Sequence, residues 1–249
     1  RHTRLRTVTG VQTCALPICN TAYHESGHAI VARMLPKTDP VHKVTIIPRG
    51  RALGVTMQLP EEDRYSMDRD RMLNTISVLF GGRIAEEIFM HQMTTGASNE
   101  FERATSIARD MVTRYGMSDL LGPMVYAENE GEIFLGRSIT KTTNMSEETM
   151  RKVDTEIRRI IDEQYAVARN ILDTNRDKVE AMAKALLDWE TIDAEQIDDI
   201  VQGRPPRPPK PGGSPGSSAG GAGTSPSQPT PSSGSPSAEP RSEEHTSEL

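Results

Sequence analysis

Five consecutive residues, His24-Glu25-Ser26-Gly27-His28, combine side chains that can bind a metal ion and move a proton. A helix places residues four positions apart on one face, one turn from each other, so both imidazoles can converge on a single Zn²⁺ ion. Glu25 then lies beside the ion, where a carboxylate can take a proton from water that attacks a carbonyl group. The pattern therefore predicts one Zn²⁺ per chain and hydrolytic chemistry.

The spacing leaves the third metal ligand open. Catalytic zinc sites use three protein ligands and keep one position for water. No third histidine follows at the spacing of the extended zinc motifs, and His42 lies at the start of a predicted strand, so an acidic residue on a later helix is expected. The helical candidates are Glu86, Glu87, Glu100 and Glu102. Spacing alone does not choose among them.

The elements that position this zincin-type HEXXH motif are predicted by hydrophobic periodicity. Apolar residues at helical spacing predict a helix over residues 21–35, which Pro36 closes. Alternating β-branched residues over 44–47 and 53–57, with a Pro-Arg-Gly-Arg turn between them, predict a β-hairpin or two short strands. Small residues inside the first helix, Ser26 and Gly27, suggest that another element packs closely against it.

The rest of the foldable chain is predicted to be helical. A helix capped by Ser66 or Asp68 is expected to run to about residue 90, with an interruption at Gly81-Gly82 that indicates close packing or a kink. Gly116 ends a further helix over 99–115. Residues 122–138 are expected to be irregular or weakly stranded. Helices from Ser146, over 176–187 and over 194–201 follow. The predicted fold class is mainly α (α+β), with a small β element, the HEXXH helix and a long helical hairpin.

Composition divides the chain into four parts. Residues 203–240 hold 11 of the 17 prolines and eight of the 19 glycines, which is typical of a disordered tail. Residues 8–18 and 241–249 resemble translated sequencing-adapter read-through, so segments 1–19, with both cysteines, and 241–249 are interpreted as artefacts. The expected domain covers residues 20–202, and sequence that precedes it is expected to be missing.

Charge and hydropathy exclude two classes of partner for this fragment. The net charge is -6, and an acidic domain is a poor nucleic-acid binder. No run of eighteen apolar residues occurs, so the fragment itself is expected to be soluble.

Several blocks of sequence together resemble the peptidase domain of the FtsH family, the membrane-anchored, ATP-dependent zinc metalloproteases of bacteria and of mitochondria and chloroplasts. The resemblance covers about residues 21–209. It rests on TAYHESGHA (21–29), DPVHKVTIIPRG (39–50), ALGVT (52–56), GGRIAEE (81–87), TTGASN (94–99), GRS (136–138) and TIDAEQI (191–197).

The resemblance implies that His24 and His28 bind zinc, that Glu25 is the general base and that Glu100 is the third ligand. Water activated by Zn²⁺ and Glu25 would then attack the peptide carbonyl. The family normally has Asp at the position of Glu100, so this chain departs from the pattern by one methylene group, about 1.5 Å of extra reach. Glu remains a legitimate zinc ligand.

The resemblance also implies a cellular setting. The full-length protein would be a homo-hexamer at the cytoplasmic face of the bacterial inner membrane, which degrades unfolded or misassembled membrane and cytosolic proteins in protein quality control. ATP would act only through an ATPase module, and the membrane would be reached only through N-terminal helices, both missing from this chain.

Three further hypotheses remain open at this level. The resemblance implies that the β-hairpin offers an exposed strand edge near the zinc, where an unfolded chain could add as an extra strand, although residues 44–47 are equally compatible with a buried packing strand. Glu86 and Glu87 are expected to orient the imidazoles without binding the metal themselves. The alternative function is a non-catalytic oligomerisation module with a degenerate metal site.

Overall fold

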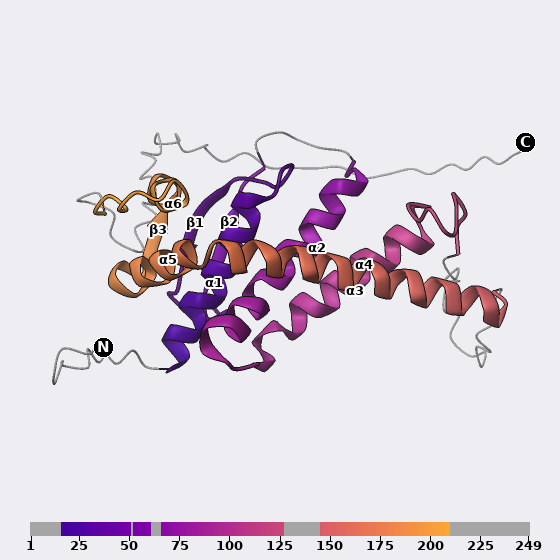
Figure 1. The fold of residues 1–249 in the computed structure, drawn as a ribbon, viewed down its shortest axis with the longest axis horizontal. Helices are drawn as coiled ribbons and strands as arrows, with labels where there is room; N and C mark the ends of the chain where they lie inside the picture. The colour runs from indigo at the N-terminus through magenta and orange to yellow at the C-terminus, as the bar shows by residue number, and fades with distance from the viewer. Residues whose placement is uncertain (1–15, 51, 61–65, 127–144, 210–249) are drawn as a thin grey trace, which may run out of the picture. The chain divides into compact units, whose positions relative to one another are not determined.

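The computed structural model describes residues 16–50, 52–60, 66–126 and 145–209. The elements are α1 (Leu16–Met34), β1 (Val41–Thr45), β2 (Val55–Gln58), α2 (Arg69–Ala85), the π-helical turn η1 (Glu86–Met90), the 3-10 turn η2 (Thr95–Ala97), α3 (Ser98–Thr113), α4 (Glu147–Thr174), α5 (Arg176–Trp189), β3 (Thr191–Asp193) and α6 (Ala194–Val201) (Figure 1). Helices around one small sheet confirm the predicted mainly α class. Most of the predicted tail and of both adapter-like ends lies outside the described residues.

Helix starts follow the predicted caps. The side chain of Asp68 accepts the backbone N–H of Arg71 at the start of α2, and Ser146 does the same for Thr149 at the start of α4. Asp193 and Gln196 form a reciprocal capping box at α6. Helix α1 begins at Leu16, five residues before its predicted start and inside the adapter-like stretch.

Helices α1 and α2 cross with their backbones in contact at glycines. A Cβ atom on Gly81 would lie 2.7 Å from the carbonyl oxygen of Gly27, and one on Gly27 would overlap the carbonyl oxygen of Gly81. The predicted interruption at Gly81-Gly82 is wrong, because α2 runs through both glycines in helical conformation. The glycines serve the predicted close packing instead.

Gly81→Ala is expected to lower the free energy of unfolding by about 1–2 kcal/mol, because overpacking against rigid backbone outweighs the better helix propensity of alanine. Ser106→Ala, at an exposed position of α3, is the control and should change it by less than about 0.5 kcal/mol. Urea unfolding of both variants measures the difference. A Gly81→Ala protein more stable than the parent would show that the helices separate easily.

The sheet has the strand order β2-β1-β3, with both pairs antiparallel. The predicted hairpin is confirmed as β1 and β2, in which Thr45 lies opposite Val55. β3 was not predicted, because a three-residue strand that also caps a helix carries no alternating pattern. Since β1 is central and Val44 is fully buried, the packing interpretation of residues 44–47 holds for β1, and the strand edge beside the HEXXH helix belongs to β2.

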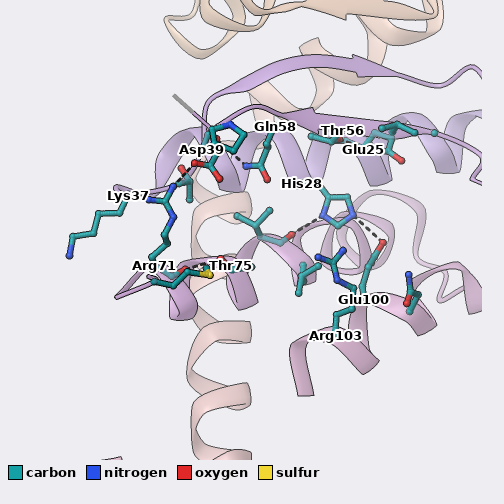
Figure 2. Close-up of a pocket in the computed structure, with 18 residues that line it drawn as sticks. Glu25, His28, Lys37, Asp39, Thr56, Gln58, Arg71, Thr75, Glu100 and Arg103 are labelled. Carbon is teal, nitrogen blue, oxygen red and sulfur yellow. Dashed lines mark hydrogen bonds and ion pairs between the residues drawn. The ribbon is translucent and has the colours of Figure 1, made fainter. Parts of the chain in front are cut away.

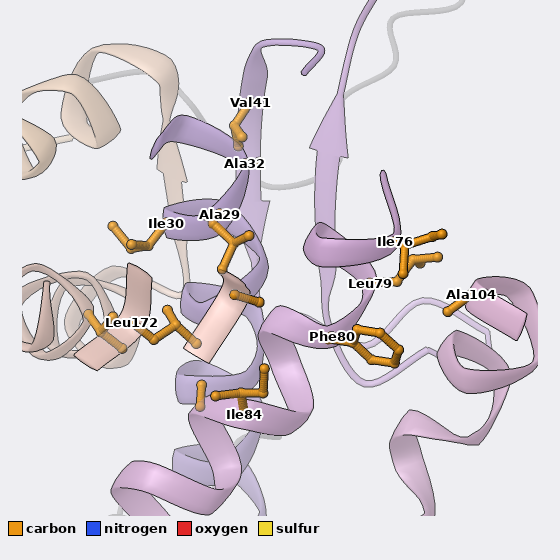
Figure 3. Packing of buried hydrophobic residues seen from close by; sticks show 14 of the residues in the cluster. Ala29, Ile30, Ala32, Val41, Ile76, Leu79, Phe80, Ile84, Ala104 and Leu172 are labelled. Atoms are coloured by element: carbon orange, nitrogen blue, oxygen red, sulfur yellow. The ribbon is translucent and has the colours of Figure 1, made fainter. Parts of the chain in front are cut away.

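One hydrophobic cluster holds the helices and the sheet together. Helix α4 packs on α2 and α3, and α5 packs on α1, so the two helices predicted as a hairpin rest mainly on other elements. Figure 3 shows buried side chains of this cluster from α1 (Ile30), α2 (Phe80) and α4 (Leu172). None of the helices in the described ranges is both long and apolar enough to cross a membrane.

The chain keeps contact with this cluster beyond the predicted domain boundary at residue 202. Asp199 of α6 is buried, and it pairs with Arg204 at 2.8 Å and with Arg207 at 2.7 Å. Two arginines on one buried carboxylate offset its desolvation. The contacts of the domain therefore extend at least to Arg207.

Candidate metal centre

The imidazoles of His24 and His28 meet on the face of α1 that looks toward α2 and α3. Their Nε2 atoms are 3.1 Å apart, and the rings stand edge to face with centroids 4.8 Å apart. Two small residues lie between the histidines. Ser26 donates a hydrogen bond of 2.7 Å from its hydroxyl to the carbonyl oxygen of Ala22, and Gly27 leaves room for the backbone of α2. The predicted helical spacing thus brings both imidazoles to one point.

Glu100 completes a triangle with the two histidines. It lies in the first turn of α3, which the short η2 turn directs toward α1. Its Oε1 atom is 3.0 Å from Nε2 of His24 and 3.2 Å from Nε2 of His28. Among the described residues, these three form the one group of His, Cys, Asp and Glu side chains close enough together to share a metal ion.

Two observations show that this triangle fits a zinc ion. A tetrahedral ion with ligand bonds of about 2.0–2.1 Å holds neighbouring ligand atoms about 3.3 Å apart, close to the three separations found here. The second carboxylate oxygen of Glu100 is buried and has no hydrogen-bond partner among the residues that the structure describes, which is costly unless another ligand satisfies it.

Gly82 makes room for the imidazoles. A Cβ atom at this position would lie 2.6 Å from Nε2 of both His24 and His28. Any side chain would push the metal-facing nitrogens apart, so the second glycine of the pair in α2 has a steric role in the site. This role could have been suspected from two adjacent glycines inside a helix, but not assigned.

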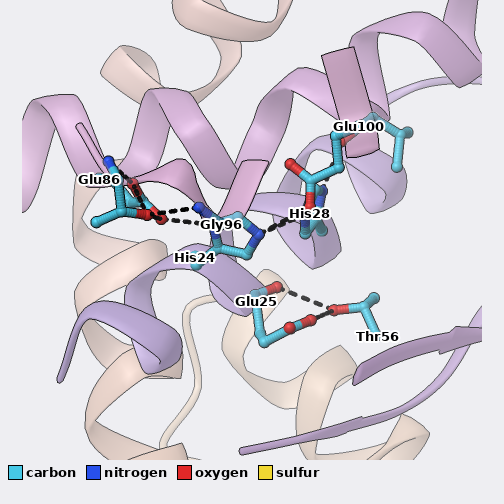
Figure 4. Close-up of polar contacts among 9 residues, drawn as sticks. His24, Glu25, His28, Thr56, Glu86, Gly96 and Glu100 are labelled. Carbon is cyan, nitrogen blue, oxygen red and sulfur yellow. Dashed lines mark hydrogen bonds and ion pairs between the residues drawn. The ribbon is translucent and has the colours of Figure 1, made fainter. Parts of the chain in front are cut away.

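The outer nitrogen of each imidazole is held by a specific acceptor. Nδ1 of His24 lies 2.8 Å from Oε1 of Glu86, and Nδ1 of His28 lies 2.7 Å from the backbone oxygen of Val78 (Figure 4). Since these acceptors receive hydrogen bonds from Nδ1–H, the proton of each neutral imidazole stays on Nδ1, and each Nε2 can present its lone pair to a metal. Glu86 is itself fixed, because it accepts both the backbone N–H and the hydroxyl of Thr94.

The electrostatics of the site favour an ion pair between His24 and Glu100. Burial alone would lower the pKa of His24, but hydrogen bonds to Glu100 and Glu86 outweigh it and raise the pKa to about 10. Burial raises the pKa of Glu100, but its contacts with His24 and His28 bring the value down to about 2. His24 must therefore lose a proton before its Nε2 can bind a metal at neutral pH.

Glu25 lies beside the triangle and points away from it toward β2. Its side chain is only 7% exposed, and its Oε2 atom accepts a hydrogen bond of 2.7 Å from the hydroxyl of Thr56. Figure 4 shows this pair below the two imidazoles. The contact with Thr56 was not predicted, because nothing in the sequence pairs a strand threonine with a helix carboxylate.

Two cavities open onto these residues. One, of about 510 Å³, is lined by His28 and extends between β2 and α2 as far as Asp39 and Arg71 (Figure 2). The other, of about 710 Å³, is lined by His24, Thr94 and Leu53. Both are also lined by Glu25, Gly54 and Glu100, so an extended ligand that follows residues 52–58 through both cavities would pass these two carboxylates.

The remaining candidates lie elsewhere. Glu87 accepts a hydrogen bond of 2.7 Å from the hydroxyl of Tyr165 and forms an ion pair with Arg169 at 3.3 Å. Its predicted role in orienting an imidazole is therefore wrong. Its neighbour Glu86 does contact His24. Glu102 and His42 are exposed and belong to no metal-ligating group within the described residues.

Comparisons with known proteins agree on one family. The family model described as peptidase family M41 matches residues 19–200. The chain is 67% identical over 187 residues to the ATP-dependent zinc metalloprotease FtsH of Cupriavidus metallidurans, a match that covers 75% of this chain and 28% of that protein. The protein of the same name from Photobacterium profundum is 56% identical over 184 residues, which cover 73% of this chain and 26% of the relative. The chain thus spans little more than a quarter of these relatives.

Proposed function

Because the chain belongs to peptidase family M41, we propose that it is the zinc-dependent endopeptidase domain of an ATP-dependent protease of the FtsH type. One observation carries the proposal. Two imidazoles and one carboxylate offer three ligand atoms within 4.8 Å of one another, and the buried residue Glu25 lines the same two cavities as Glu100. The proposed domain comprises residues 20–202 together with the contacts that reach Arg207.

In this proposal His24, His28 and Glu100 hold one Zn²⁺ ion, and Glu25 is the general base. When bound, the ion supplies Lewis acidity, which lowers the pKa of water and polarises the scissile carbonyl. Glu25 takes the proton from the attacking water and returns it to the nitrogen of the leaving amine. Glu86 and the carbonyl oxygen of Val78 keep both imidazoles in the tautomer that leaves Nε2 free.

We propose an unfolded polypeptide as the substrate. β2 is an edge strand of the sheet and lines one cavity, and residues 52–54, which lead into it, line the other, so an extended chain can add beside this segment and bind through main-chain hydrogen bonds. Such binding depends little on the side chains of the substrate, which suits degradation of unfolded or misassembled proteins. The proposed substrate edge of the hairpin is residues 55–58.

The setting in the whole protein is proposed from the relatives, which are named ATP-dependent. We propose that ATP acts through a separate ATPase module, that six copies assemble, and that N-terminal helices anchor the assembly at the cytoplasmic face of the bacterial inner membrane. The isolated chain is then expected to cleave unfolded proteins and to leave folded ones intact.

The neighbouring residues Glu86 and Glu87 provide a matched pair of variants. Glu86→Gln weakens the acceptor for Nδ1 of His24 and is expected to lower zinc affinity by about 10–100-fold. Glu87→Gln changes a carboxylate that contacts Tyr165 and Arg169, and should leave zinc affinity within about twofold. Competition with a chromophoric chelator measures both. Equal effects of the two changes would show that Glu86 has no specific role in zinc binding.

The proposed function is tested with casein, an unfolded protein substrate. The zinc-loaded 249-residue chain should cleave casein, lose this activity with a chelator and regain it when zinc is returned. A chain that binds zinc but leaves casein intact would favour the non-catalytic alternative.

A further inference from the structure

We infer that Thr56 is a positioning residue for the general base, and that it fixes the carboxylate of Glu25 from strand β2. The inference rests on the proposed function, because it assigns a partner to the base of that reaction. Its observation is independent of the metal ligands, since it concerns the contact between a helix carboxylate and a strand hydroxyl.

The hydrogen bond is short and directional. Oγ1 of Thr56 lies 2.7 Å from Oε2 of Glu25 and 3.2 Å from the backbone oxygen of the same residue. A hydroxyl has one proton to donate, and the shorter contact to the charged oxygen is the stronger of the two. Among the residues that the structure describes, no other side chain hydrogen-bonds to this carboxylate.

Gly54 closes the other side of the carboxylate. A Cβ atom on Gly54 would lie 2.7 Å from Oε1 and 2.8 Å from Cγ of Glu25. The backbone of the strand therefore reaches the carboxylate where Gly54 lacks a side chain, and two residues later Thr56 donates to it. Together they restrict the rotation of a side chain that would otherwise have several rotamers.

This restriction matters for the rate. A base must lie within hydrogen-bonding distance of the proton that it removes, and small losses of orientation lower the rate strongly. Thr56 pairs with Val44 of β1 through its backbone, on the strand whose other edge is the proposed binding edge for substrate. The strand proposed to receive the peptide thus also holds the base that acts on it.

Three variants of the 249-residue chain separate the hydroxyl from the shape of the residue. Thr56→Val keeps the β-branched shape and removes the donor, whereas Thr56→Ser keeps the donor. Thr45→Val is the control, because it removes a hydroxyl from the same sheet that bonds to Thr191, at 2.8 Å, and not to Glu25. Each is measured for zinc content, melting temperature, kcat and KM on a peptide, and calorimetric affinity for a peptide hydroxamate.

Thr56→Val is expected to keep one zinc per chain and a KM close to that of the parent, while kcat falls about 10–100-fold, as for the loss of one hydrogen bond to a charged group. Hydroxamate binding, which involves no turnover, should weaken about tenfold for the same reason. Thr56→Ser should restore both to within about threefold. Thr45→Val should lower the melting temperature without changing kcat.

The inference is overturned if zinc-loaded Thr56→Val keeps kcat within about twofold of the parent, or if Thr56→Ser is as slow as Thr56→Val. If Thr56→Val does not fold, Thr56→Ser decides instead. The inference then requires that its kcat and its hydroxamate affinity stay within about threefold of those of the parent. An inactive parent that binds zinc would instead refute the proposed function, so the two failures are distinguishable.

Discussion

Glu25→Gln is expected to lower kcat for peptide hydrolysis by about 10²–10⁴-fold, the contribution typical of a general base. The amide has nearly the shape of the carboxylate, and its oxygen can still accept a hydrogen bond from the hydroxyl of Thr56, so the side chain should keep its place. It cannot accept a proton from water. The loss should therefore appear in kcat, with little change in KM.

Zinc content is the control for this variant. Glu25 is not among the three residues that offer ligand atoms to the metal, so Glu25→Gln should retain one zinc per chain. Elemental analysis and steady-state kinetics on the same preparation measure both. A zinc-loaded Gln variant that cleaves casein as fast as the parent would show that another group removes the proton.

Glu100→Ala is expected to have the second large effect, the loss of the metal. Changing a residue that hydrogen-bonds to a metal ligand typically weakens metal binding by about 10–100-fold. Removing one of the three protein ligands should weaken zinc binding more than that. Only the two imidazoles would remain, one protein ligand short of the three that catalytic zinc sites use. Zinc per chain should fall from one toward zero after dialysis.

Glu100→Asp is the matched variant, because the related family normally carries Asp at this position. It shortens the side chain by one methylene group, about 1.5 Å, and is expected to retain zinc because rotamers on both sides can adjust. Zinc and activity in both the parent and the Asp variant would show that Glu replaces Asp here. Zinc in the Asp variant alone would refute Glu100 as a ligand in this chain.

The local chemistry of the site was predictable because it follows from helical spacing. Histidines four residues apart must share a face, so the meeting of His24 and His28 requires only that α1 be a helix. The caps at Asp68, Ser146 and Asp193 were equally readable, because each places a short polar side chain at the start of an apolar pattern.

The long-range parts of the site were not predictable from spacing. Four acidic residues were compatible with the third ligand position, and only the resemblance to a known family selected Glu100 among them. Glu86 and Glu87 are adjacent in sequence but face opposite neighbours, His24 and Tyr165, because the turn at η1 directs them differently. Which side each one faces depends on how α2 packs.

Strand β3 and the contact of Thr56 with Glu25 escaped prediction for a related reason. Both depend on segments brought together by the tertiary fold, and neither leaves a periodic pattern. The glycine pair in α2 did leave a signal, but its conformational freedom indicated a kink as readily as close packing. The structure shows instead that packing against α1 and the imidazoles explains both residues.

Anomalous diffraction from crystals of the zinc-loaded chain, recorded on both sides of the zinc absorption edge, tests the proposed metal centre. We expect one peak per chain, about 2.0–2.2 Å from Nε2 of His24, from Nε2 of His28 and from a carboxylate oxygen of Glu100. A peak bound by other side chains, or no peak between these three residues in zinc-saturated crystals, would contradict it.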